Sequence, residues 1–305
     1  MNTTARRYPV GIQTFSEIRK GNYVYIDKTD LMWEMTRMKY IFLSRPRRFG
    51  KSLLSSTLRS YFEGRKDLFE GLKIMELEED WEEYPVIHLD ISTAKSQPNA
   101  EELQKSLIFA MLPWAEKYGR GELEETPGRL LAGMIRRAYE QTGKQVAVII
   151  DEYDAPLLEV LHEDERLPEF RRVMQELYVP LKASDPMLRF CFITGITKFS
   201  QLSIFSTINN LKNITLVPKY SAICGITEQE LVTDMAEDIR QMAEAFGCTP
   251  EEMHAKLKAK YDGYHFSEDS SEVYNPYSLM NAFGDKKLQN YWFSSGTPSY
   301  LIRQM

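Results

Sequence analysis

Gly50, Lys51 and Ser52 stand where an apolar run gives way to an amphipathic pattern. The run Tyr40–Leu43 has strong β preference, and apolar residues recur at helical spacing from Leu54 onward. A strand, a tight loop and a helix in this order aim backbone N–H groups and the helix dipole at a phosphate group. In that setting the lysine neutralises phosphate oxygens and the serine hydroxyl holds Mg²⁺. The stretch therefore predicts a phosphate-binding loop for ATP and Mg²⁺.

The loop fits the phosphate-loop pattern except at its first glycine, which is replaced by Arg45. An arginine does not readily take the positive φ of a glycine, so this replacement weakens the pattern. A Gly-Lys-Ser tripeptide alone is weak evidence too, since it can arise by chance with a solvated lysine. Its position at a strand-to-helix junction favours nucleotide binding. The expected contact residues are Arg47, Arg48, Phe49, Gly50, Lys51, Ser52 and Leu53.

A second apolar run, Val146–Ile150, ends in two adjacent carboxylates, Asp151 and Glu152. A five-residue, mostly β-branched run is typical of a strand buried on both faces. Adjacent strand residues point to opposite faces, so the two carboxylates can have different roles. We expect Asp151 to hold Mg²⁺ through water, with Ser52 as the other metal-binding residue, and Glu152 to polarise the attacking water. The simpler alternative is that the two acids merely begin a loop.

Two further strands end in polar side chains. Residues 188–195 form a predicted buried strand, and Thr194 lies where ATPases of this type place a residue that senses the γ-phosphate. Lys198 follows shortly after. Asp90 lies near the end of the predicted strand 85–91, where ligands collect in open α/β sheets, although a capping carboxylate explains it equally well.

These strands and the helical patterns between them predict an α/β fold. We expect a P-loop NTPase with three αβα layers around a mostly parallel five-stranded sheet, with its fifth strand at 211–217. Helical patterns cover 99–118, 126–142 and 165–183.

The pattern divides the chain into three parts. Residues 1–39 form a leader that packs on the core, with Tyr25 and Lys28 as candidates for a place beside the adenine base and plain core packing as the alternative. Residues 40–224 form the ATPase core. Residues 225–305 indicate a small helical lid or winged-helix module with an aromatic-rich tail. The aromatic rings of the tail either pack loops against the core or stack on bases.

Composition excludes several classes of protein. The chain of 305 residues is 43% hydrophobic and 27% charged, as in ordinary globular proteins, and has no apolar run long enough for a membrane span. The N-terminus has no apolar signal core, and the three cysteines form no Cys-x-x-Cys pair, so we expect a cytoplasmic protein. A net charge of −6 argues against a chain that binds nucleic acid over its whole surface.

Several segments resemble one family, in matching order over nearly the whole chain: PVGIQTF, YIDKTDL, FLSRPRRFGKSLL, YPVIHLD, VAVIIDEYDAP, ITGITKFSQLSIFSTINNL, YDGYHF and VYNPYS. They resemble the bacterial AAA-ATPase-like proteins, whose loop also lacks the first glycine. The resemblance implies a P-loop ATPase of the additional-strand, catalytic-glutamate class. It assigns phosphate and Mg²⁺ binding to Lys51 and Ser52, and Mg²⁺ binding and water activation to Asp151 and Glu152. Thr194 is the sensor by position only.

Proteins of this family often continue into a PD-(D/E)XK nuclease-like domain, whereas this sequence ends at Met305. The acidic-x-lysine element of such nucleases occurs only as Asp285-Lys286-Lys287, so we expect no nuclease activity in this chain. The remaining alternatives are a shortened form, a fragmentary gene product and a standalone ATPase.

The first functional hypothesis is a slow, Mg²⁺-dependent ATPase that couples hydrolysis to movement of the C-terminal module. The sequence contains no recognisable arginine finger, so a homo-oligomer or a protein partner is the expected source of one. The second hypothesis is a nucleotide-dependent switch that binds ATP or ADP with little turnover. A third, the ATPase half of a nucleic-acid-processing system, rests on the companion domain of the family alone.

Overall fold

The computed structural model describes residues 6–197, 210–267, 269–270 and 272–292. Its centre is a five-stranded sheet in the spatial order β2-β3-β4-β1-β5, in which every neighbouring pair is parallel. The strands are β1 (Tyr40–Ser44), β2 (Val86–Asp90), β3 (Val146–Asp151), β4 (Leu188–Gly195) and β5 (Lys212–Asn213). Strand β1 precedes the phosphate loop, and strand β3 leads into the two carboxylates. Strand β4 lies between them and is therefore the additional strand of the predicted class. The predicted α/β P-loop NTPase fold is confirmed.

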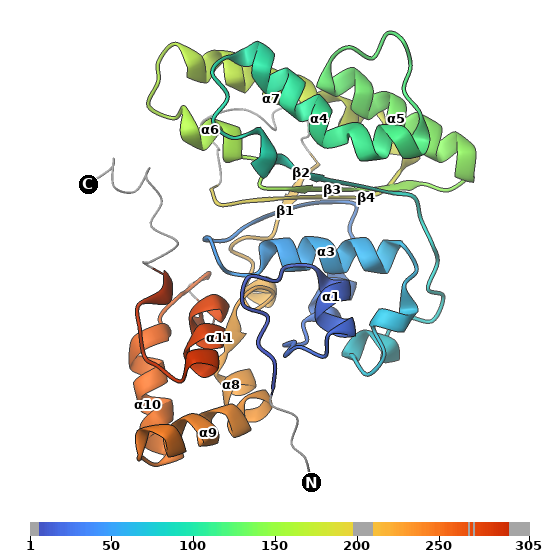
Figure 1. Cartoon of the computed structure of the whole chain (residues 1–305). Helices are drawn as coiled ribbons and strands as arrows, with labels where there is room; N and C mark the ends of the chain where they lie inside the picture. Colours follow the sequence, from blue (N-terminus) through green and yellow to red (C-terminus); the bar gives the residue numbers. More distant parts are fainter. Residues whose placement is uncertain (1–5, 198–209, 268, 271, 293–305) are drawn as a thin grey trace.

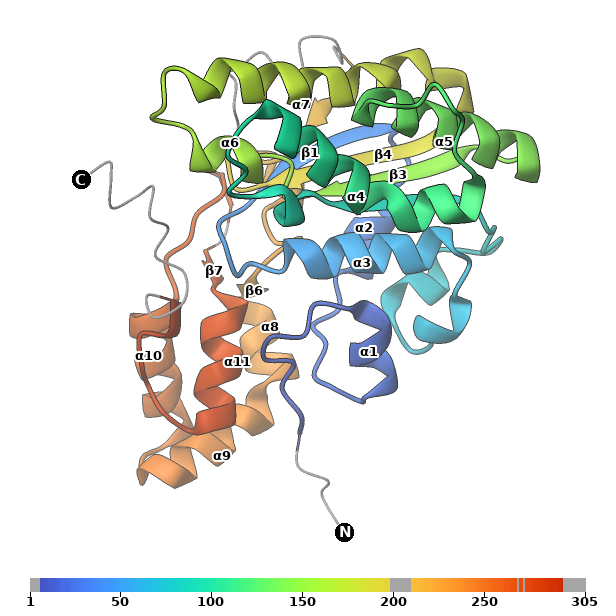
Figure 2. The same ribbon diagram turned by 45° about the horizontal axis from the view of Figure 1, so that its top comes forward.

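Helices cover both faces of the sheet (Figures 1 and 2). On one face lie α4 (Ala100–Tyr118), α5 (Pro127–Thr142) and α7 (Arg166–Ala183). On the other lie α3 (Lys51–Phe62) and α1 (Phe15–Lys20). A separate cluster of buried apolar side chains fills each interface, and the two clusters contain alternate residues of β3, because successive side chains of a strand point to opposite faces.

Strand register brings the polar strand ends together at one edge of the sheet. Leu43 in β1 pairs with Thr194 in β4, and Asp90 in β2 pairs with Asp151 in β3. All six residues of β3 are buried, as its apolar run predicts. The phosphate loop and both carboxylates therefore meet at the carboxyl end of the sheet, which is where ligands bind in open α/β folds.

The fifth strand is shorter than predicted. We expected it over 211–217, but only Lys212–Asn213 pair with β1. The side chain of Asn213 accepts a hydrogen bond of 2.9 Å from Thr215 N, which turns the backbone away from the ladder. A 3₁₀ turn then begins at Pro218, a residue without a donor for strand pairing.

The described part of the C-terminal module contains four α-helices and a two-stranded antiparallel ladder, β6 (Ile226–Thr227) with β7 (Val273–Tyr274). The helices are α8 (Glu228–Asp234), α9 (Ala236–Phe246), α10 (Pro250–Tyr261) and α11 (Pro276–Asp285). They enclose a third apolar cluster, which includes Val24 of the leader. The Thr-x-x-Glu pattern at 227–230 forms the capping box that it predicts.

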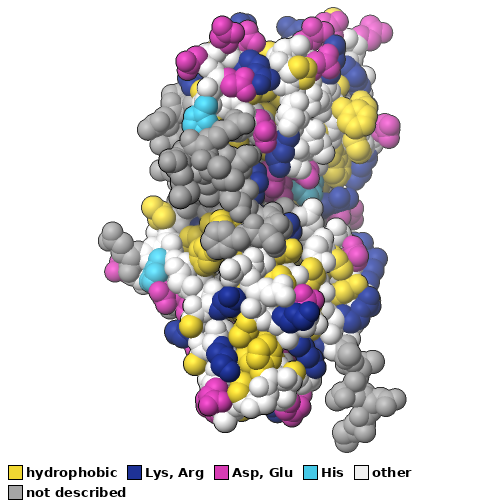
Figure 3. Space-filling view, turned by 60° about the vertical axis from the view of Figure 1, so that its left-hand side comes forward, with side chains coloured by type: hydrophobic (Ala, Val, Ile, Leu, Met, Phe, Trp, Pro, Cys, Tyr) yellow, Lys and Arg dark blue, Asp and Glu magenta, His cyan; other side chains and the backbone are white. Residues whose placement is uncertain are grey.

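The remaining helices are short: α2 (Thr29–Met35) in the leader and α6 (Ala155–Glu159) after β3. Within the described ranges, no helix is both long and apolar enough to cross a membrane. On the face shown in Figure 3, basic and acidic side chains are interspersed, in keeping with the modest net charge of −6.

Candidate nucleotide-binding site

The phosphate loop turns tightly between β1 and α3. Two of its residues take positive φ angles, Arg48 at 70° and Gly50 at 86°. The Lys51 side chain folds back over the loop, and its Nζ donates to the carbonyl oxygens of Arg45 at 3.0 Å and Pro46 at 3.1 Å. Only 5% of Lys51 is exposed. Burial lowers the pKa of its ammonium group, while the carboxylates of Asp151 and Glu152 raise it.

Arg45, in place of the first glycine, is a structural residue. Its backbone does not need the positive φ that a glycine provides. The residue is 1% exposed, and its guanidinium donates to the carbonyl oxygens of Ser44, Thr215 and Tyr220 at 2.8 to 2.9 Å. Burial lowers its pKa to about 10. Arg45 thus ties the start of the loop to the segment after β5, and its side chain is not free to bind phosphate.

Asp151 ends β3 next to the start of α3. It is 3% exposed, and burial raises its pKa to about 6, opposed by the Ser52 hydroxyl and by the charge of Lys51. Its Oδ1 accepts a hydrogen bond of 2.9 Å from Glu152 N. A hydroxyl and a buried carboxylate side by side are oxygen donors of the kind that Mg²⁺ prefers. Ser52 and Asp151 therefore fit the predicted metal site.

Glu152 has an ion-pair partner that the sequence did not reveal. Its Oε2 lies 2.7 Å from Lys95 Nζ, and its φ angle is +50°. Lys95 follows the 3₁₀ turn Ile91–Ala94 after β2. Non-glycine residues with positive φ are uncommon and concentrate at functional sites. Asp90, in contrast, caps that 3₁₀ turn by accepting from Ser92 N at 2.9 Å, as the capping alternative predicted.

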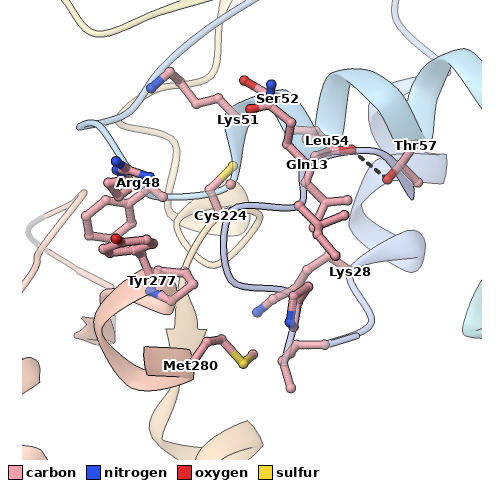
Figure 4. Close-up of a pocket in the computed structure, with 18 of the residues that line it drawn as sticks. Gln13, Lys28, Arg48, Lys51, Ser52, Leu54, Thr57, Cys224, Tyr277 and Met280 are labelled. Carbon is pink, nitrogen blue, oxygen red and sulfur yellow. Dashed lines mark hydrogen bonds between the residues drawn. The ribbon is translucent and has the colours of Figure 1, made fainter. Parts of the chain in front are cut away.

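A cavity of about 450 Å³ lies beside the loop (Figure 4). All seven residues predicted to contact the nucleotide line it, together with Glu152 and Lys95. The leader contributes residues 9–13 and the pair predicted beside the base, Tyr25 and Lys28. The C-terminal module contributes Pro276, Tyr277 and Met280. The cavity thus has a charged end at the loop and an apolar end between the leader and the module.

The sequence profile of a family described as predicted AAA-ATPase matches residues 9–205, which is more than half of the chain. This span contains most of the leader, the phosphate loop and both carboxylates. The chain belongs to this family. An uncharacterized protein in the vnfD 5′ region of Azotobacter chroococcum mcd 1 is 34% identical over 300 residues, which are 97% of this chain and 55% of that protein. The chain therefore spans about half the length of this relative. No solved structure matches this chain.

Thr194, the predicted sensor, lies at the carboxyl end of β4. Its side chain is fully buried, and its hydroxyl donates to Leu43 O at 2.8 Å across the sheet. Among the described residues, it is not part of the cavity lining. Thr194 lies within the ladder, where its hydroxyl already has a partner, and its sensor role stays a prediction. Lys198 lies outside the described residues.

In this member of the family, Asp154 anchors the segment that follows β4. Its carboxylate accepts from Ile196 N at 2.9 Å, Thr197 N at 2.8 Å and Thr197 Oγ1 at 2.9 Å. Asp154 is fully buried, and burial raises its pKa. The phenol of Tyr153 donates to Thr197 O at 2.9 Å. The segment that follows β3 is thereby joined to the segment that follows β4.

Aromatic side chains from the end of the chain pack directly on the phosphate loop. The Phe49 ring lies 4.7 Å from the Tyr264 ring centroid, and the Arg48 guanidinium lies 4.3 Å from that of Tyr277. Figure 4 shows Arg48 and Tyr277 side by side in the cavity. These contacts support loop packing, the first of the two roles expected for the aromatic-rich tail.

Proposed function

We propose that this protein binds ATP with Mg²⁺ in the cavity and hydrolyses it slowly. The observation that carries the proposal is the shared location of the predicted groups. One cavity is lined by the seven loop residues and by Glu152, and Asp151 adjoins Ser52 at its edge. Phosphate oxygens would accept from loop N–H groups and from Lys51 Nζ, which now donates to two loop carbonyls. Mg²⁺ held by Ser52 and Asp151 would neutralise charge on the β- and γ-phosphates.

Glu152 is the residue we assign to water activation. It lies beside the metal-site carboxylate, and its side chain is 23% exposed and faces the cavity. Lys95 contacts Oε2, so Oε1 remains the oxygen that would accept a proton from water. The apolar end of the cavity, between leader residues 9–13 and Met280, has the character of a site for a nucleobase.

Coupling to the C-terminal module is supported by contacts of the module with the leader and with the loop. Lys28 Nζ of the leader lies 2.5 Å from both carboxylate oxygens of Glu230 in α8. Trp292 Nε1 donates to Arg47 O in the loop at 3.2 Å. A nucleotide that changes the loop conformation would therefore act directly on side chains of the module. We infer that the module moves with nucleotide occupancy.

The ion pair of Glu152 with Lys95 also favours a second candidate, a switch with little turnover. The ion pair holds the Glu152 carboxylate against Lys95, which keeps one of its two oxygens from contact with water. Replacement of Glu152 by glutamine separates the two candidates. For an ATPase, Glu152→Gln abolishes phosphate release while ATP affinity is kept. For a switch, the wild type releases almost no phosphate and the substitution changes little. Replacement of the exposed Glu101 by glutamine is the matched control.

A further inference from the structure

Lys95 forms an ion pair with the proposed water-activating carboxylate. Its Nζ lies 2.7 Å from Glu152 Oε2, and it lines the same cavity as Lys51 and Ser52. We propose that Lys95 is a catalytic residue whose ammonium group stabilises negative charge on the γ-phosphate oxygens during hydrolysis. This inference rests on the proposed ATPase function and adds to it a source of positive charge within the same chain.

Besides Arg47 of the loop, three other basic residues line the cavity in different surroundings. Lys28 is bound by Glu230 at the apolar end, and Arg48 stacks on Tyr277. Lys51 is 5% exposed and folded onto the loop carbonyls. The Lys95 side chain is 32% exposed, so it keeps room to move from one oxygen partner to another.

The backbone around Lys95 holds it at the edge of the sheet. Strands β2 and β3 pair with Asp90 opposite Asp151, so the segments that follow them emerge side by side. Gln97 Nε2 donates to Lys95 O at 2.9 Å, and Arg166 at the start of α7 donates to Gln97 O at 3.0 Å. The next residue in the chain, Ser96, has a φ angle of +57°. A positive φ beside Lys95 and another at Glu152 indicate a local geometry that the surrounding structure enforces.

The chemistry of the step explains why a cation is useful here. Water oxygen bonds to the γ-phosphorus, and the bond to the β–γ bridging oxygen breaks with its electron pair passing to ADP. Glu152 takes a proton from the water, and this proton then passes to the phosphate product. Negative charge spreads over the γ-phosphate oxygens in the transition state, where an added positive charge lowers the barrier. Lys95 loses no proton during the reaction, and its role is electrostatic.

The test compares Lys95→Met with Lys95→Arg and with Lys105→Met, a control at an exposed lysine of α4. Calorimetry measures the affinity of each protein for MgADP and for MgADP with aluminium fluoride, a mimic of the transferring phosphoryl group. We expect Lys95→Met to keep MgADP affinity within about threefold and to lose about 10–100-fold in affinity for the fluoride complex. Phosphate release should fall by a similar factor, and Lys95→Arg should retain part of both properties, because it keeps the charge.

The measurements distinguish a wrong role for Lys95 from a wrong ATPase function. If the wild type hydrolyses ATP and Lys95→Met hydrolyses it equally fast or faster, with unchanged affinity for the fluoride complex, the role of Lys95 is wrong and the ATPase function stands. If the wild type binds no nucleotide, the proposed function is wrong and the inference is wrong with it. Thermal unfolding of each variant shows whether the fold is intact.

Discussion

The guanidinium carbon of Arg45 lies 4.1 Å from the ring centroid of Phe266, so the first residue of the phosphate loop is stacked on an aromatic residue of the C-terminal module. Phe266 also contacts the Phe49 ring at 5.3 Å. Both ends of the loop's Arg-Pro-Arg-Arg-Phe segment are therefore held by the same ring. The arrangement explains how this loop forms without its first glycine: a buried arginine side chain replaces the tight glycine turn as the element that fixes the loop.

Replacement of Arg45 by glycine restores the common loop pattern, yet we expect it to destabilise the protein. The change removes three hydrogen bonds to carbonyl oxygens and the stack on Phe266. The free energy of unfolding should fall by about 2–4 kcal/mol, as measured by urea titration. An unchanged stability would show that the loop does not depend on this side chain.

The Asp151 carboxyl should make stability depend on pH in metal-free buffer. Its pKa is about 6 in the fold and 3.8 in the unfolded chain, so the folded state holds an extra proton between these values. The stabilising contribution of this proton is complete below about pH 4 and is lost as pH rises through about 6. Asp151→Asn keeps an acceptor for Glu152 N and should be more stable than the wild type at neutral pH, by roughly 1–3 kcal/mol. If the free energies of unfolding of the wild type and of Asp151→Asn changed with pH in parallel from pH 4 to 8, this role of the Asp151 proton would be contradicted.

Trp292 should report nucleotide binding by fluorescence. Its indole N–H donates to Arg47 O, so a change in loop conformation alters its surroundings. We expect MgATP to change the tryptophan emission of the wild type and to have a much smaller effect on Trp292→Phe. Replacement of Trp114, which donates to His88 O away from the cavity, is the control and should leave the response intact. Equal responses in the wild type and in Trp292→Phe would argue against coupling through this contact.

Asp154 should act on stability through the segment after β4. Asp154→Ala removes the acceptor of three hydrogen bonds and should lower the free energy of unfolding by about 1–3 kcal/mol. Asp154→Asn keeps an accepting oxygen and should lose less. Thermal unfolding of both variants checks the order. A larger loss in Asp154→Asn than in Asp154→Ala would contradict this role for the carboxylate.

The parts of the fold that local patterns determine were predictable. The apolar run before Asp151 and the strand-loop-helix pattern around Lys51 each depend on a few neighbouring residues, and both formed as expected. Contacts between residues far apart in the chain were not predictable from local patterns. Thr194 was predicted as a sensor by position, and the bond of its hydroxyl to a carbonyl of the adjacent strand is a contact that no local pattern reveals.

Lys95 was missed for a similar reason. It lies 57 residues from Glu152 in the chain, and only the β2–β3 pairing brings the two together. The signal that could have found it is a lysine placed a few residues after a predicted parallel strand, at the edge where the loop and the carboxylates were already expected. The length of the fifth strand was overestimated because apolar residues continue past the turn at Asn213.

The central claim is that ATP binds at the loop through Lys51, and calorimetry tests it most directly. ATP and ADP are titrated with Mg²⁺ into the wild type, Lys51→Ala and the control Lys105→Ala, with phosphate release measured on the same samples. We expect binding in the wild type and the control, and a loss of affinity of about 100-fold or more in Lys51→Ala. Absence of binding in the wild type, or equal binding in Lys51→Ala, would contradict the central claim.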